Sequence, residues 1–178
     1  MTYLSKGGVI LDYWALYDSP LGPLLLKSDG KYLTGLYMNR ELPEGPADLP
    51  VFCRAVAWLD AYFQGQNPVM DVPLKLEGTA FQRRVWQLLP TIPYGEIRTY
   101  GDLAKEVAEQ MGKEKMSAQA VGQAVGKNPV GILVPCHRVV GAEGGMTGYG
   151  GGLENKIWLL THEGWQIREK KLIGKRSK

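Results

Sequence analysis

The stretch Gly131-Ile-Leu-Val-Pro-Cys-His-Arg-Val139 determines how the rest of this sequence is interpreted. Residues 132–134 form a short apolar, partly β-branched run, which predicts a buried strand or a segment that passes through a core. Pro135 ends this run because proline lacks an N–H and has a fixed φ. Cys136 comes next and is followed by His137 and Arg138, basic neighbours that favour a nucleophilic thiolate. Cys136 is therefore a candidate nucleophile, although a small buried residue beside a surface His-Arg pair fits the same pattern.

Several flanking stretches add to this motif. They are Asn128-Pro129 before it, and Thr147-Gly148-Tyr149, Gly151-Gly152-Leu153 and Trp158-Leu159-Leu160-Thr161-His162-Glu163-Gly164 after it. Together with Pro135-Cys136-His137-Arg138-Val139 they resemble, in order and spacing, the methylated-DNA–protein-cysteine methyltransferases, also called O6-alkylguanine-DNA alkyltransferases. The resemblance covers roughly residues 81–164 and is weaker before them. It implies a stoichiometric DNA repair protein that transfers the alkyl group from guanine O6 to its own cysteine in one irreversible turnover.

The resemblance also implies catalytic roles for four residues. Cys136 would accept the alkyl group, and a water would link its sulfur to His137, which Glu163 orients and supports in its charged form. Tyr100 would donate a proton to the departing guanine. Burial raises the pKa of a thiol and a charged imidazole lowers it, so the sequence leaves open which effect dominates at Cys136. Without the resemblance, Glu163 could equally be a surface acid near a helix end and His137 a core residue.

A guanine that is flipped out of the duplex needs hydrogen-bond partners and a wall. By resemblance, the carbonyls of Cys136 and Val139 would accept from the guanine amino group, and the Gly150 N–H would face O6. Tyr149 would line the pocket, and Asn128 would brace the turn beneath the acceptor cysteine. Arg138 is assigned to the same substrate site. The glycines of residues 144–152 suit a loop that lets backbone approach a ligand, and they also suit a mobile surface loop.

Two short predicted helices have the outline of a helix-turn-helix. The first starts at Tyr100 after an N-cap at Thr99 and ends near Met111, and the second spans about residues 118–127 after a cap at Ser117. In the family that the chain resembles, the second helix enters the minor groove, where small residues permit close approach. We assign DNA contacts to Ser117, Ala118, Gln119, Gln82 and Arg83.

Gln119 departs from the family pattern. Relatives usually carry an arginine at this position, which fills the gap left by the flipped base, whereas glutamine brings no charge. We therefore expect weaker binding to duplex DNA, with intact chemistry on the free base or on a single strand. Some relatives have serine at the position of Gly150. Glycine keeps the backbone N–H donor there but lacks the serine hydroxyl.

The predicted fold class is α+β. Residues 13–39 alternate in polarity around turns at 18–23 and 27–31, which predicts a small antiparallel sheet. A helix over residues 51–64 and a connecting strand over 70–76 should follow, and then a mostly helical part that contains the helix-turn-helix. We expect an N-terminal structural domain at residues 1–77, a DNA-binding alkyltransferase domain at 78–165, and a basic, flexible tail at 166–178.

Composition narrows the class of protein further. The chain has 178 residues, 44% of them hydrophobic, enough for a buried core. Residues 1–80 carry six Lys/Arg and nine Asp/Glu and residues 81–178 carry fifteen and nine, so the halves differ in charge, −3 against +6. Most of the excess positive charge lies in the tail. It is compatible with a solvated chain end and also with an attraction to phosphates.

Other features bear on partners and location. The only histidines are His137 and His162, and the only cysteines are Cys53 and Cys136, so we expect no metal site and no cofactor. We interpret Cys53 as structural. No window has the length and apolarity of a membrane span or a signal peptide, which favours a cytoplasmic protein. The resemblance implies double-stranded DNA containing O6-alkylguanine as the partner, and we expect a monomer. The alternatives are a binding-only sensor of alkylguanine, a transcriptional regulator that uses the same helices, and a cysteine hydrolase. Cys136 argues against the sensor, and no oxyanion motif supports the hydrolase.

Overall fold

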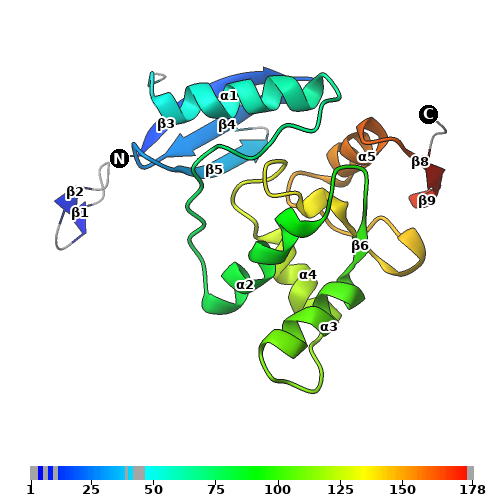
Figure 1. The fold of residues 1–178 in the computed structure, drawn as a ribbon. Helices are drawn as coiled ribbons and strands as arrows, with labels where there is room; N and C mark the ends of the chain where they lie inside the picture. Colours follow the sequence, from blue (N-terminus) through cyan, green and yellow to red (C-terminus); the bar gives the residue numbers. More distant parts are fainter. Residues whose placement is uncertain (1–3, 6–7, 10–11, 39, 42–46, 176–178) are drawn as a thin grey trace. The chain divides into compact units, whose positions relative to one another are not determined.

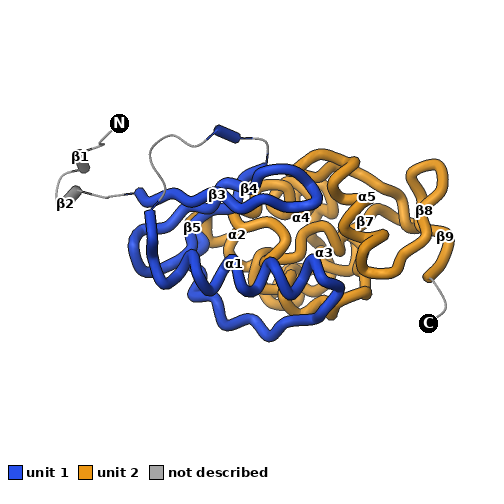
Figure 2. The backbone as a smooth tube through the Cα atoms, turned by 90° about the horizontal axis from the view of Figure 1, so that it is seen from above, with its two compact units in different colours: residues 1–76 blue, residues 77–178 orange. Residues whose placement is uncertain are grey.

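The computed structural model describes residues 4–5, 8–9, 12–38, 40–41 and 47–175. The chain divides into two compact units, residues 1–76 and 77–178, coloured separately in Figure 2. Mixed α+β structure is present, with a small antiparallel sheet in the first unit and most helices in the second. The predicted fold class is thereby confirmed.

Unit 1 is a three-stranded antiparallel sheet covered on one face by a helix (Figure 1). Its strands are β3 (Tyr13–Ser19), β4 (Gly22–Ser28) and β5 (Leu33–Met38), and its helix is α1 (Pro50–Phe63). A separate short ladder pairs β1 (Leu4–Ser5) with β2 (Gly8–Val9). The central strand β4 buries three consecutive leucines, and α1 buries the stripe that contains Ala55, Leu59 and Tyr62. These apolar faces form the core of the unit.

The connecting strand predicted over residues 70–76 is wrong. The structure has only an isolated bridge between Leu33 and Leu74, held by hydrogen bonds from Leu33 N–H to the Pro73 carbonyl at 2.8 Å and from Lys75 N–H to the Leu33 carbonyl at 3.0 Å. Pro73 has no N–H to donate, so the segment cannot extend the ladder.

Unit 2 begins with α2 (Ala80–Leu88), whose first turn is closed by a capping box between Thr79 and Gln82. A 3₁₀ turn, η1 (Leu89–Thr91), and a short strand, β6 (Arg98–Thr99), lead into α3 (Tyr100–Gln110). After a turn comes α4 (Ala118–Gly126). The Trp86 indole donates to the Ala124 carbonyl at 2.8 Å and ties α2 to α4. The three helices lie side by side in Figure 1 and pack on one another.

The remaining elements of unit 2 surround the segment of interest. They are η2 (Cys136–Arg138), β7 (Val139–Val140), η3 (Ala142–Gly144), α5 (Leu153–His162), β8 (Trp165–Arg168) and β9 (Lys171–Lys175). Strands β6 and β7 are parallel, with Arg98 opposite Val139 and Thr99 opposite Val140. This pairing places the start of α3 beside the segment that follows Cys136.

We expected a flexible tail from residue 166, but β8 and β9 form an antiparallel hairpin that reaches Lys175. Ile167 and Leu172 pack against the buried cluster of Val140, Met146 and Leu160. The Met146 N–H also donates to the Lys170 carbonyl at 2.8 Å. Alternating apolar residues within the basic sequence thus anchor the hairpin.

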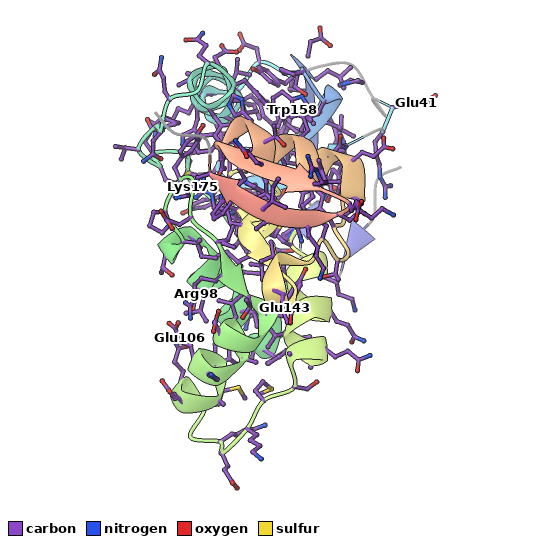
Figure 3. The ribbon with its side chains drawn as sticks, turned by 90° about the vertical axis from the view of Figure 1, so that its right-hand side faces the viewer. Glu41, Arg98, Glu106, Glu143, Trp158 and Lys175 are labelled. Atoms are coloured by element: carbon purple, nitrogen blue, oxygen red, sulfur yellow. The ribbon has the colours of Figure 1, made fainter. Side chains whose placement is uncertain are left out.

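Charged side chains fix two edges of this unit (Figure 3). Lys175 of the hairpin contacts Glu96 at 2.6 Å, and Arg98 of β6 contacts Glu106 of α3 at 2.5 Å. No helix in the described part of the chain has the length and apolar character to cross a membrane.

Candidate active site

A tight, buried turn delivers Cys136 to its position. Val134 N–H donates to the Val130 carbonyl at 3.0 Å, and Ile132 has a φ of 70°, a left-handed conformation that is strained for a β-branched residue. The sequence predicted either a buried strand or a segment that passes through a core, and residues 132–134 form the second of these. The Asn128 amide holds this turn, accepting from Val130 N–H at 3.1 Å and donating to the Val134 carbonyl at 2.7 Å.

The sulfur of Cys136 lies in a buried and polar environment. The side chain is 5% exposed, and the Asn128 amide donates to Sγ at 3.1 Å. Burial raises the pKa of the Cys136 thiol, while the Asn128 hydrogen bond, the charge of Lys156 and the Tyr149 hydroxyl act in the opposite direction. Burial is the strongest of these effects, which answers the question that the sequence left open.

His137 and Glu163 are joined, as the resemblance implied. Nε2 of His137 lies 2.7 Å from Oε1 of Glu163, and both side chains are fully buried. Burial lowers the pKa of His137, although the carboxylate partly offsets this by favouring the charged ring. A neutral His137 that donates from Nε2 to Glu163 has Nδ1 as the ring nitrogen that can accept a proton.

Arg138, which we assigned to the substrate site, makes its contacts within the chain. Its guanidinium binds Glu163 through Nε at 3.0 Å and Nη2 at 3.0 Å, and Nη1 donates to the Ile92 carbonyl at 2.7 Å. Gly95 N–H adds a further bond to Glu163 at 3.0 Å. Burial raises the pKa of Glu163, but His137 and Arg138 together lower it to about 2, so the carboxylate is ionised. The ion pair was not predicted, because its two residues lie 25 positions apart in sequence and leave no local pattern.

Lys156 is a residue at this site that the sequence reasoning missed. Its side chain is fully buried, and Nζ donates to the carbonyls of Val139 at 2.6 Å and Thr147 at 2.9 Å and to the Tyr100 hydroxyl at 3.4 Å. Burial lowers the pKa of Lys156 to about 8. A signal was present in the sequence. Lys156 and Glu163 occupy the same helical stripe as the buried Leu159 and Leu160, where a charged residue is unexpected.

Tyr100 stands at the edge of a cavity of about 770 Å³. Its hydroxyl donates to the Gly148 carbonyl at 3.3 Å, and burial raises its pKa. The cavity is lined by Thr99, Tyr100, Gly101, Ala118, Gln119, Gly122, Gln123, Gly126, Gly141, Ala142 and residues 147–150. It therefore opens between the N-terminus of α3, the outer face of α4 and the glycine-rich loop. This volume is in the range of small-molecule sites.

The predicted DNA-contact residues fall into two groups. Gln119 and Ala118 line the cavity, and Ser117 caps α4 by accepting from Ala120 N–H at 3.3 Å. Gln82 and Arg83 lie at the start of α2 and are not among the lining residues. Gln82 closes the capping box with Thr79 N–H at 2.8 Å, and Arg83 donates to the Gly78 carbonyl. Both side chains therefore make local contacts within the chain, at exposed positions.

Tyr149 and Gly150 line the cavity, whereas Cys136 is not among its lining residues. The Tyr149 hydroxyl is buried, and it acts to lower the pKa of the Cys136 thiol. A Cβ at Gly150 would lie 2.9 Å from the Gly126 carbonyl oxygen of α4, so the loop rests directly on helix backbone.

Known proteins share both units. The family model described as the DNA binding domain of 6-O-methylguanine DNA methyltransferase matches residues 80–165, and that of its ribonuclease-like domain matches residues 13–76. A methylated-DNA–protein-cysteine methyltransferase of Mycobacterium leprae is 49% identical over 159 residues, covering 84% of this chain and 91% of its own. One from Methanosarcina acetivorans is 46% identical, covering 85% and 98%. The crystal structure of Mycobacterium tuberculosis OGT in complex with DNA superposes with a TM-score of 0.72 at 48% identity, covering 85% of this chain and 92% of that chain.

Proposed function

The chain belongs to the 6-O-methylguanine DNA methyltransferase family, and we propose that Cys136 is the residue that accepts the alkyl group. The protein is a DNA repair methyltransferase that acts on O6-alkylated guanine. One observation carries the assignment of the site. The buried Cys136 is hydrogen-bonded by Asn128 and is followed directly by a histidine paired with Glu163, beside a cavity that opens toward α4.

Activation of the sulfur comes first. A water passes the thiol proton of Cys136 to Nδ1 of His137, while Glu163 fixes the ring through Nε2. Arg138 keeps that carboxylate in place and is a positioning residue, since its contacts are to Glu163 and Ile92. Asn128 stabilises the thiolate by a hydrogen bond to Sγ, and the Tyr149 hydroxyl also acts to lower the pKa of the thiol. These contacts act against burial, which on its own keeps the thiol protonated.

The flipped guanine then occupies the cavity between Tyr100 and the glycine-rich loop. The Val139 carbonyl already accepts from Lys156, but a carbonyl has two lone pairs and can also accept from the guanine amino group. The Cys136 carbonyl supplies a second acceptor, and Gly150 N–H faces O6. Tyr149 forms a wall of the occupied pocket.

The transfer is an in-line displacement at carbon. The thiolate electron pair forms the S–C bond, the C–O6 bond breaks, and its electron pair moves onto the purine. Tyr100 protonates the purine and takes a proton back from solvent, while His137 releases the former thiol proton to solvent, so one proton in total passes from the thiol to the purine. The product is a thioether at Cys136, which cannot return to a thiolate, so each molecule acts once.

Duplex DNA is bound through α4 with the two glutamines Gln119 and Gln123 on its exposed, cavity-lining face. Unit 1 has a structural role. We place the protein in the cytoplasm as a monomer, where a free Cys136 stays reduced.

Intact-mass spectrometry tests the assignment. The protein is incubated with a duplex that contains one O6-methylguanine, and the peptide with Cys136 should gain one methyl group in place of the thiol proton. Cys136→Ala should gain nothing, and Cys53→Ser, which alters the exposed cysteine, should behave like the unaltered protein. Methylation at Cys53, or methylation that survives Cys136→Ala, would overturn the proposal.

A further inference from the structure

Lys156 presents an energetic problem that the steps above do not resolve. A buried ammonium costs several kcal/mol unless an opposite charge lies nearby. Lys156 has no exposed surface, and its Nζ donates only to two carbonyls and one hydroxyl. Within the described residues, no carboxylate forms an ion pair with Lys156. Its hydrogen bonds are satisfied, but its charge is not.

The other charges at the site do not supply the missing anion. Glu163 is the buried carboxylate, and it is already paired with the guanidinium of Arg138. Burial lowers the pKa of His137, which favours its neutral form, and it raises the pKa values of Tyr100 and Tyr149, which keeps both hydroxyls protonated. The groups contributed by α3, η2, the 147–150 loop and the end of α5 therefore sum to one unbalanced positive charge, that of Lys156.

The remaining ionisable group is Cys136. Lys156 and Cys136 interact electrostatically, and each favours the charged form of the other. We propose that Lys156 is the counter-cation of the acceptor site, a positioning residue that pairs with the Cys136 thiolate before transfer and with the purine charge during transfer. This inference rests on the proposed function of Cys136.

The geometry suits both halves of this role. Lys156 comes from the first turns of α5, and it reaches Val139, three residues past the sulfur, and Tyr100, which faces the guanine. As the S–C bond forms and the C–O6 bond breaks, one negative charge moves from sulfur to the purine, and a fixed cation beside both ends stabilises it throughout. The ammonium keeps its three protons, since the purine receives its proton from Tyr100.

A thiol titration separates this role from a merely structural one. In a Cys53→Ser background, the rate of Cys136 alkylation by iodoacetamide is measured from pH 6 to pH 11.5 for the parent, Lys156→Met and Lys156→Gln. Loss of the cation should move the pH midpoint up by about one unit or more in both variants. Single-turnover methyl transfer from O6-methylguanine duplex at pH 7.5 should fall by about tenfold or more, matching the lost thiolate.

Two controls sharpen the result. Lys105→Gln removes an exposed lysine on α3 and should leave the midpoint and the transfer rate unchanged. Melting temperatures should stay equal or rise in Lys156→Met, because an unbalanced buried charge is removed. An unshifted midpoint in Lys156→Met, or a normal midpoint in Lys156→Gln, whose amide keeps a hydrogen-bond donor, would overturn the proposal. If the parent transfers no methyl group, the proposed function fails, whereas the iodoacetamide midpoint still reports on the cation.

Discussion

Glu163→Gln gives the sharpest test of how the site is held together. The carboxylate joins the end of α5 to His137, Arg138 and the Gly95 turn. Its pKa falls from 4.5 to about 2 in the folded protein. A change of one in the pKa corresponds to about 1.4 kcal/mol, so folding favours the ionised form of Glu163 over the protonated form by about 3 kcal/mol. Glutamine resembles the protonated carboxyl, and we expect it to lower the free energy of unfolding by that amount at pH 7.

The sign of the pH dependence follows from the depressed pKa. The stabilisation is fully present above the unfolded-state value of 4.5 and disappears as the pH falls through about 2. The difference between the parent and Glu163→Gln should therefore shrink from about 3 kcal/mol at pH 5 toward zero near pH 2. Titrations of other carboxylates, such as Asp29 and Asp102, are common to both proteins and cancel in the difference.

Urea unfolding at pH 7, 5, 4, 3 and 2.5, followed by tryptophan fluorescence, measures this difference. Glu154→Gln is the matched control, because Glu154 is exposed in the first turn of the same helix. It should change stability by less than about 0.5 kcal/mol at every pH. A Glu163→Gln effect that stays constant from pH 5 to pH 2.5 would refute the reasoning, because it would mean that the charge of the carboxylate contributes nothing.

Three further predictions concern binding, the loop and the turn. Gln119→Arg should tighten binding to duplex DNA and steepen its salt dependence, because it adds a cation to α4 near phosphates; unchanged affinity in a fluorescence anisotropy titration counts against the placement of this residue. Gly150→Ser should slow methyl transfer by about tenfold or more, because its Cβ would lie 2.9 Å from the Gly126 carbonyl oxygen and push the loop away. Gly148→Ser is the control, because nothing lies within 4 Å of a Cβ at that position. Equal transfer rates for the two variants would contradict the packing of the loop on α4. Asn128→Ala should raise the pH midpoint of Cys136 alkylation, because the amide donates to Sγ. It should also destabilise the fold by about 2 kcal/mol, because the amide holds the buried turn. An unchanged midpoint would show that the contact to Sγ has no effect on the thiol.

Local sequence patterns predicted most elements of the fold because they depend on near neighbours. Alternation gave the β3–β4–β5 sheet, and caps at Thr99 and Ser117 marked the starts of α3 and α4. The patterns failed where neighbours far along the chain decide. The basic tail forms a hairpin because Ile167 and Leu172 find apolar partners around Met146.

The candidate site shows the same division. The motif from Pro135 to Val139 identified Cys136 and His137, and its resemblance to a known family added Glu163, Tyr100 and Asn128. What each side chain does was decided by tertiary structure. Arg138 pairs with Glu163, and Lys156 becomes a buried cation beside Cys136, because α5 packs against η2. The sequence by itself determined which reactive group is present and which helices flank it. Burial and charge pairing arise only between segments brought together by folding, so the protonation state of that group was left to the tertiary structure.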